Sequence, residues 1–136
     1  MTAWLGVVSA DHVARAVELG IGQIGHGTRA GLLRMHRGDT LVYYSPVQHL
    51  GDREPLRAFT AIGTVSGDAI WQADEGDVHP FRRAVAYRAA HAVPVEAIRS
   101  RLELTASPNW GYQLRRGLIP LSEADVAVIG EAMTAR

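Results

Sequence analysis

The 136-residue sequence contains no cysteine and no lysine, so all 14 of its basic residues are arginine. The lack of cysteine excludes disulfides and thiolate ligands for metals. No apolar run approaches the roughly 20 residues of a membrane-spanning helix, and the N-terminus lacks the basic and apolar segments of a signal peptide. We therefore expect a cytoplasmic protein with one domain over residues 1–136 and no membrane partner.

Motifs for cofactors and for catalysis are missing as well. No strand is followed by Gly-x-Gly-x-x-Gly, and no P-loop lysine exists. The six histidines are scattered and form no His-Glu-x-x-His pattern. No Gly-x-Ser-x-Gly element supports a serine nucleophile, although a triad assembled in space stays open, because its members need not be close in sequence. We expect no cofactor, no metal and no catalytic residue. An enzyme or binder that acts on a free nucleoside or a similar small ligand is the alternative.

Positive and negative side chains are equal in number, but they are unevenly distributed along the chain. The 14 acidic residues cancel the arginines, so the whole-molecule field will not attract polyanions. Two segments nevertheless carry arginine without any acidic residue, at 26–38 and at 80–93. Arginine binds phosphate bidentately and stacks on bases, so these segments favour contact with a nucleic-acid backbone through Arg29, Arg34, Arg82 and Arg83. In the alternative, one of Arg82 and Arg83 faces solvent and the other pairs with the acidic loop at 74–77.

Hydrophobic periodicity and turn residues predict an α+β domain. Strands are expected at 4–8, 40–45, 58–65, 69–72, 82–92 and 112–118. Helices are expected at 9–19, 28–35, 94–99 and 122–133. The segments 58–65 and 69–72 should form a hairpin, and Leu32, Leu33 and Met35 should face inward. Mostly antiparallel strands with helices at the ends suggest a small β-barrel, because closure removes the sheet edges.

The segment 38–46 is the most informative part of the sequence. It predicts a strand that presents Tyr43 and Tyr44 to opposite faces of the sheet and ends at Ser45-Pro46. One tyrosine can join the core, and the tyrosine next to Ser-Pro lies at the sheet rim, where ligand pockets often form.

Other aromatic and polar residues also cluster at the ends of predicted strands. The aromatic ones are Tyr44, Phe81 and Trp110, and the polar ones are Ser9, His12, Gln23, His26 and Ser45. Such a set suits a pocket that holds a nucleobase, because stacking on an aromatic ring contributes ~1–3 kcal/mol per base and polar groups read the base edge. Each residue also has an ordinary structural role available, such as closing the core or capping a helix.

The chain resembles the EVE domain family of the PUA-like superfamily, which is related to the YTH readers of methylated adenine. It is most similar to the small UPF0310-type members. The resemblance is carried by short pieces in a specific order: Trp4-Leu5-Gly6-Val7-Val8-Ser9, Gly25-His26-Gly27, Gly38-Asp39 with Tyr43-Tyr44-Ser45-Pro46, Phe59-Thr60-Ala61-Ile62-Gly63, Pro80-Phe81-Arg82-Arg83, and Trp110-Gly111-Tyr112 with Arg115 and Gly117.

This resemblance implies a PUA-like, mostly antiparallel β-barrel flanked by helices. It further implies a module that binds a modified or flipped nucleobase, notably modified cytosine, in DNA or RNA, as a monomer or weak homodimer. Carried over to this chain, the ligand-binding residues are Ser9, His12, Gln23, Ile24, His26, Tyr44, Ser45, Pro46, Phe81 and Trp110, and Arg115 joins the arginines at the backbone. The YTH readers have tryptophan in the loop after the first helix, where Gly22 and Gln23 fall here, so a more polar pocket is expected.

Overall fold

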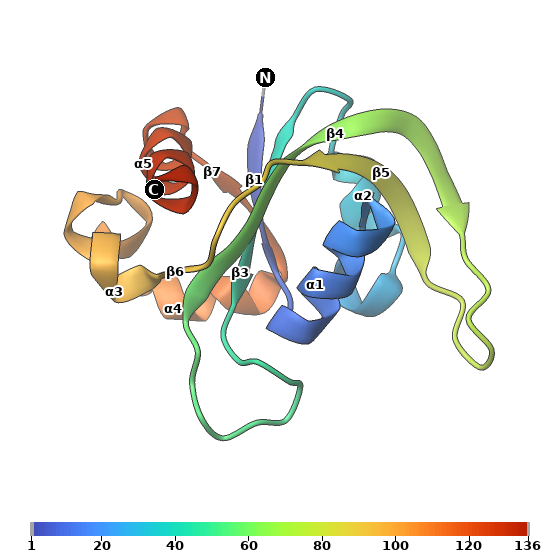
Figure 1. The fold of residues 1–136 in the computed structure, drawn as a ribbon, viewed down its shortest axis with the longest axis horizontal. Coiled ribbons are helices and arrows are strands. Elements are labelled where there is room, and N and C mark those ends of the chain that lie inside the picture. Colours follow the sequence, from blue (N-terminus) through green and yellow to red (C-terminus); the bar gives the residue numbers. More distant parts are fainter. Residues whose placement is uncertain (1, 136) are drawn as a thin grey trace.

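Two buried strands, β1 (Ala3–Val7) and β3 (Thr40–Ser45), run parallel at the centre of a seven-stranded sheet (Figure 1). The computed structural model describes residues 2–135. The sheet order is β2-β5-β4-β3-β1-β7, and β6 pairs with β4. The outer strands, all in antiparallel pairs, are β2 (Ile21–Gly22), β4 (Ala58–Gln72), β5 (Phe81–Tyr87), β6 (Val93–Pro94) and β7 (Leu118–Leu121). The central strands are almost wholly apolar because helices cover both of their faces.

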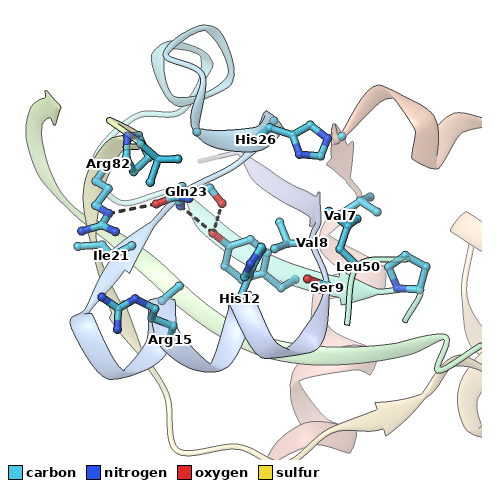
Figure 2. Close-up of a pocket in the computed structure, with 18 of the residues that line it drawn as sticks. Val7, Val8, Ser9, His12, Arg15, Ile21, Gln23, His26, Leu50 and Arg82 are labelled. Carbon is cyan, nitrogen blue, oxygen red and sulfur yellow. Dashed lines mark hydrogen bonds between the residues drawn. The ribbon is translucent and has the colours of Figure 1, made fainter. Parts of the chain in front are cut away.

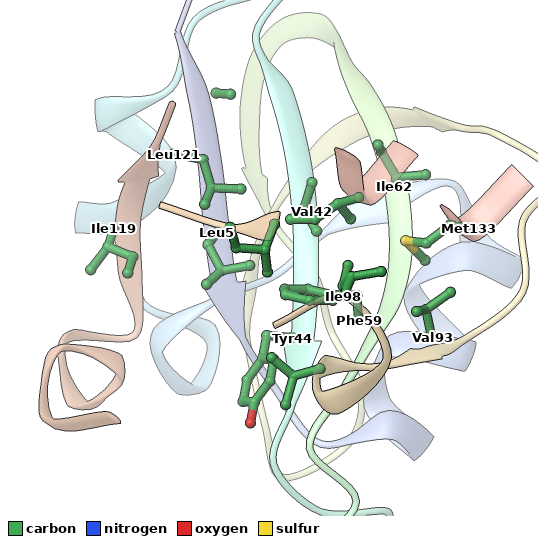
Figure 3. Close-up of a cluster of buried hydrophobic side chains, with 14 residues drawn as sticks. Leu5, Val42, Tyr44, Phe59, Ile62, Val93, Ile98, Ile119, Leu121 and Met133 are labelled. Carbon is green, nitrogen blue, oxygen red and sulfur yellow. The ribbon is translucent and has the colours of Figure 1, made fainter. Parts of the chain in front are cut away.

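The helices divide between the two sides of the sheet, as Figure 1 shows. On one side lie α1 (Ala10–Leu19) and α2 (Ala30–Arg34). On the other lie α3 (Val95–Ile98), α4 (Trp110–Gln113) and α5 (Glu123–Thr134). Each side has its own hydrophobic cluster, and Figure 3 shows the one beneath α3 and α5. Tyr44 belongs to this cluster and Tyr43 to the other, so the prediction that the two tyrosines face opposite sides is confirmed.

The predicted α+β class is confirmed, but the sheet is not closed into a barrel. Strands β2 and β7 remain at its two ends. Within residues 2–135, the two-residue strand β2 pairs with β5 and not with β7, so the two edges do not meet. Curvature arises instead within β4, whose register with β5 shifts between Val65 and Ile70.

Two sequence predictions about strands are wrong for local reasons. The expected hairpin at 58–72 is one continuous strand, β4, because Ser66 to Ala69 form an irregularity rather than a turn. The reversal comes later, where Glu75 pairs with Val78. The expected strand at 112–118 is instead α4 followed by the 3-10 turn Leu114–Arg116, and Gly117 ends this turn with a φ of 78°.

The sequence predictions about side-chain burial in α2 and about helix caps are confirmed in part. Leu32 and Met35 are buried as predicted, but Leu33 is 52% exposed, because adjacent residues of a helix point in different directions and Leu32 occupies the inward one. Ser122 caps α5 as predicted, accepting a hydrogen bond from the backbone nitrogen of Asp125. Ser9 occupies the cap position of α1, but its hydroxyl donates to the Asp11 carboxylate instead.

Candidate functional site

A cavity of about 820 Å³ opens where β1 gives way to α1 (Figure 2). Its walls come from segments far apart in the sequence, namely one face of α1, the loop at 23–27, the loop at 46–50, the β4–β5 hairpin tip and the turn at 114–117. The apolar part includes Val7, Val8, Ile21, Pro46 and Leu50.

One wall of the cavity is held by the fully buried Tyr43. Its phenolic oxygen lies 3.0 Å from the backbone nitrogen and 3.0 Å from the carbonyl oxygen of Gln23. Burial raises the pKa of Tyr43, so the hydroxyl stays protonated and donates to that carbonyl. The Gln23 side chain is fixed in turn, because Arg82 Nε donates to Gln23 Oε1 at 3.0 Å.

The loop above this wall has an unusual backbone. Gly25, His26 and Gly27 have φ values of 57°, 58° and 84°. Positive φ is routine for glycine but costs other residues energy, and such residues gather at functional sites. Glycine is also required at position 27, since an added Cβ would lie 2.7 Å from the Cβ of Pro80 on the hairpin tip. The loop is thereby packed against the hairpin and presents the exposed His26 at the cavity.

Positive charge dominates the lining. Arg15, Arg82, Arg115 and Arg116 line the cavity together with a single carboxylate, Glu75. Glu75 is already engaged by two of the arginines, at 3.2 Å from Arg15 and in a close hydrogen bond with Arg82. These contacts, Arg82 first, lower the pKa of Glu75.

Two arginines of the lining are left without a partner of opposite charge. Within residues 2–135, neither Arg115 nor Arg116 forms an ion pair. Both are exposed, so this side of the cavity mouth is electropositive.

The predicted ligand-binding residues separate into two groups. Five line the cavity: Ser9, His12, Gln23, His26 and Pro46. The others, Ile24, Tyr44, Ser45, Phe81 and Trp110, lie outside its lining. Strand alternation explains part of this, because Tyr44 points to the opposite side of the sheet from Tyr43 and packs edge-on against Trp110 at 6.2 Å.

The remaining members of that second group have internal partners. Ser45 is buried, and its hydroxyl lies 2.8 Å from that of Thr60. Ile24 is buried in the cluster beneath α1 and α2, and Phe81 packs against the same cluster.

The predicted backbone arginines also separate. Arg82 and Arg115 line the cavity, whereas Arg29, Arg34 and Arg83 do not. Arg83 is 6% exposed and donates to the carbonyl oxygens of Gly67 at 2.8 Å and Met35 at 2.9 Å. Arg34 lies over the Trp4 ring at 4.9 Å. Burial and internal hydrogen bonds therefore keep Arg83 from a phosphate, and its role in the structure is internal.

Several lining residues were not anticipated from the sequence. Arg15 lies one helical turn after His12 and Arg116 follows Arg115, so both could have been found from spacing. At the strand 40–45, Tyr44 was expected at the pocket, whereas the lining includes Tyr43. Leu50 and Glu75 lie in loops, and the course of a loop cannot be predicted from hydrophobic periodicity.

Within the described range 2–135, no group of three or more His, Asp or Glu side chains could hold a metal ion. In the same range, no helix is long and apolar enough to cross a bilayer.

Comparisons with known proteins find a matching family, similar sequences and a similar solved structure. The sequence profile of the EVE domain matches residues 2–132. A UPF0310 protein of Renibacterium salmoninarum is 48% identical over 131 residues, covering 96% of this chain and 94% of that protein. A UPF0310 protein of Bacillus subtilis is 36% identical over 132 residues, covering 96% and 90%. A solved structure from Pseudomonas putida shares the fold, with a TM-score of 0.59 at 18% identity over 96% of this chain and 98% of that one.

Proposed function

This chain belongs to the EVE domain family, and on that premise we propose that it is a nucleic-acid-binding module that holds one modified or extruded base in the cavity beside α1. The observation that carries the proposal is the cavity itself. It combines apolar walls, oriented polar groups and an electropositive mouth.

The apolar walls suit a flat ring. Val7, Val8 and Ile21 come from strands or strand ends, and Pro46 and Leu50 come from the loop that faces them. A volume of about 820 Å³ falls in the range of ~300–1,000 Å³ that is usual for small-ligand sites. It accommodates a nucleobase together with a substituent on its ring.

Polar groups that can read a base edge lie beside these walls. Because Gln23 Oε1 already accepts from Arg82, the side-chain amide nitrogen of Gln23 is left as a donor. The imidazoles of His12 and His26 also reach the cavity lining (Figure 2). Selectivity for a modification would come from these groups, since hydrogen bonds to the edge distinguish one base from another.

The arginines at the mouth favour a strand over a free nucleoside. Arg115 and Arg116 are exposed and lack a carboxylate partner within residues 2–135. A nucleoside carries no phosphate for them to contact, whereas an oligonucleotide does. Phosphate contacts position a nucleic acid without reading its sequence.

The test is a binding panel of short single-stranded oligonucleotides containing methylcytosine, hydroxymethylcytosine or methyladenine, with the matching nucleosides and unmodified strands. Gln23→Ala should weaken a selected oligonucleotide and its nucleoside alike. The double variant R115A/R116A should weaken only the oligonucleotide and flatten its salt dependence, because fewer counterions are released. Tight binding of a free nucleoside that ignores both arginines would replace the proposal with a small-molecule binder or enzyme.

A further inference from the structure

Tyr112 is the most exposed aromatic side chain among residues 2–135, at 69%. Two positions earlier, Trp110 is half-buried and packs against the cluster beneath α5, where it contacts Tyr44. Trp110 therefore anchors α4 to the domain, while Tyr112 stays outside the core. The interior of the protein gives no reason for a large aromatic ring at this position.

The ring of Tyr112 is joined to the cavity through one neighbour. The guanidinium of Arg115 lies over it, 5.3 Å from the ring centroid, and Arg115 itself lines the cavity. Residues three apart share one face of a helical segment, so the two flat groups form a continuous surface that begins at the cavity wall.

The backbone that carries Tyr112 is held in place by hydrogen bonds to Asn109. The backbone nitrogens of Tyr112 and Gln113 donate to the carbonyl oxygen of Asn109 at 3.1 and 3.2 Å. The Gln113 side-chain nitrogen also donates to Asn109 Oδ1 at 3.1 Å. A pre-ordered surface loses less conformational entropy on binding than a mobile one.

We propose that Tyr112 and Arg115 form a stacking subsite for the nucleotide next to the base held in the cavity. This inference rests on the proposed function. A base in the cavity brings its neighbour in the strand to the cavity edge, where Arg115 lies. Every base has a π-face, so stacking on tyrosine and arginine tolerates any sequence. The ligand is therefore a single-stranded or locally opened strand of at least two nucleotides.

The test pairs a change in the protein with a change in the ligand. Binding is measured by fluorescence anisotropy, using the best oligonucleotide of the panel with normal neighbours or with abasic sites on both sides of the modified base. Tyr112→Ala should weaken binding of the normal strand by about tenfold, which lies within the range of one lost base stack. The wild-type chain should lose a similar factor on the abasic strand, and Tyr112→Ala should then cost nothing more.

Tyr112→Phe is the matched control, because it keeps the ring and removes only the hydroxyl. Its affinity should equal that of the wild type. The subsite is overturned if Tyr112→Ala binds the normal strand fully, if its loss persists on the abasic strand, or if Tyr112→Phe loses as much. Failure of the wild-type chain to bind any probe overturns the proposed function itself, so the two failures are distinguishable. Thermal unfolding of each variant checks that this exposed position leaves the fold intact.

Discussion

The hydroxyl of Tyr43 hydrogen-bonds both the backbone nitrogen and the carbonyl oxygen of Gln23, each at 3.0 Å. This contact joins β3 to the chain just after β2. Within residues 2–135, β2 and β3 are not hydrogen-bonded neighbours in the sheet. A side chain thus connects the interior strand β3 to the segment that follows the edge strand β2. The same contact sets the position of one wall of the cavity.

Tyr43→Phe should lower the free energy of unfolding by about 1–3 kcal/mol, because it leaves a backbone donor and acceptor of Gln23 unpaired. Ligand affinity should fall as well, since the wall loses its support. Urea denaturation and oligonucleotide titration measure the two effects. Tyr44→Phe is the control: no hydrogen bond from its hydroxyl is found within residues 2–135, so stability should stay within about 0.5 kcal/mol. Equal losses in both variants would contradict this account.

His26→Gly should separate stability from binding. A non-glycine residue in the left-handed region costs ~1–2 kcal/mol, partly offset by the greater flexibility of glycine in the unfolded chain. We expect the midpoint of thermal unfolding to stay level or rise, while affinity for the selected oligonucleotide falls.

Arg57→Gly is the matched control for this variant. Among residues 2–135, Arg57 is the other non-glycine residue with positive φ, at 51°, and it does not line the cavity. Its replacement should leave binding unchanged. A stable His26→Gly variant with full affinity would remove His26 from the binding surface.

Arg83 and Arg116 should respond in opposite ways to replacement by methionine. Arg83→Met removes the guanidinium hydrogen bonds to the carbonyl oxygens of Gly67 and Met35, so unfolding free energy should fall by about 3 kcal/mol. Arg116 is exposed, so Arg116→Met should keep its stability and lose oligonucleotide affinity most strongly at low salt. Denaturation curves measure the change in stability, and oligonucleotide titrations at two salt concentrations measure the change in affinity. A stable Arg83→Met with weakened phosphate binding would reverse the assignment.

Acid should weaken the contact between β3 and the N-terminal strand through Asp39. Burial of Asp39 opposes its ionisation, but hydrogen bonds from the Trp4 indole and the His36 backbone outweigh it and hold the pKa of Asp39 below 3.8. A lowered pKa in the folded state stabilises the fold above the unfolded value, and this contribution disappears as pH falls through the folded value.

Asp39→Asn should therefore be less stable at neutral pH and lose less stability between pH 5 and pH 2, as measured by urea denaturation. Asp68→Asn is the control, because the Asp68 side chain is 78% exposed. Its acid response should match that of the wild type. An unchanged acid response in Asp39→Asn would show that other carboxylates account for the loss.

Strand periodicity predicted the central sheet well, because β1 and β3 bury residues on both faces and have little freedom of register. Tyr44 was expected at the pocket because it precedes Ser45-Pro46, but alternation fixes only that Tyr43 and Tyr44 face opposite sides, and it is Tyr43 that lines the cavity. Residues 112–116 were wrongly included in a strand expected at 112–118, because Tyr112 fits a pleated sheet as well as a helix. The helical form of this segment depends on Asn109 and on the positive φ of Gly117. Arg83 was expected to contact a nucleic-acid backbone, because nothing in the sequence shows that its guanidinium meets the carbonyl oxygens at the end of α2.

Much of the cavity lining comes from the chain reversals at 23–27, 46–50, 75–80 and 114–117, although Val8 and Tyr43 belong both to the lining and to the cluster beneath α1 and α2. Substitutions in those reversals can alter what the cavity accepts without disturbing the packing that keeps the domain folded. Selection for a different ligand can therefore act through these reversals with little effect on the stability of the fold. A lineage that shares this architecture is free to diversify its recognition chemistry one loop at a time.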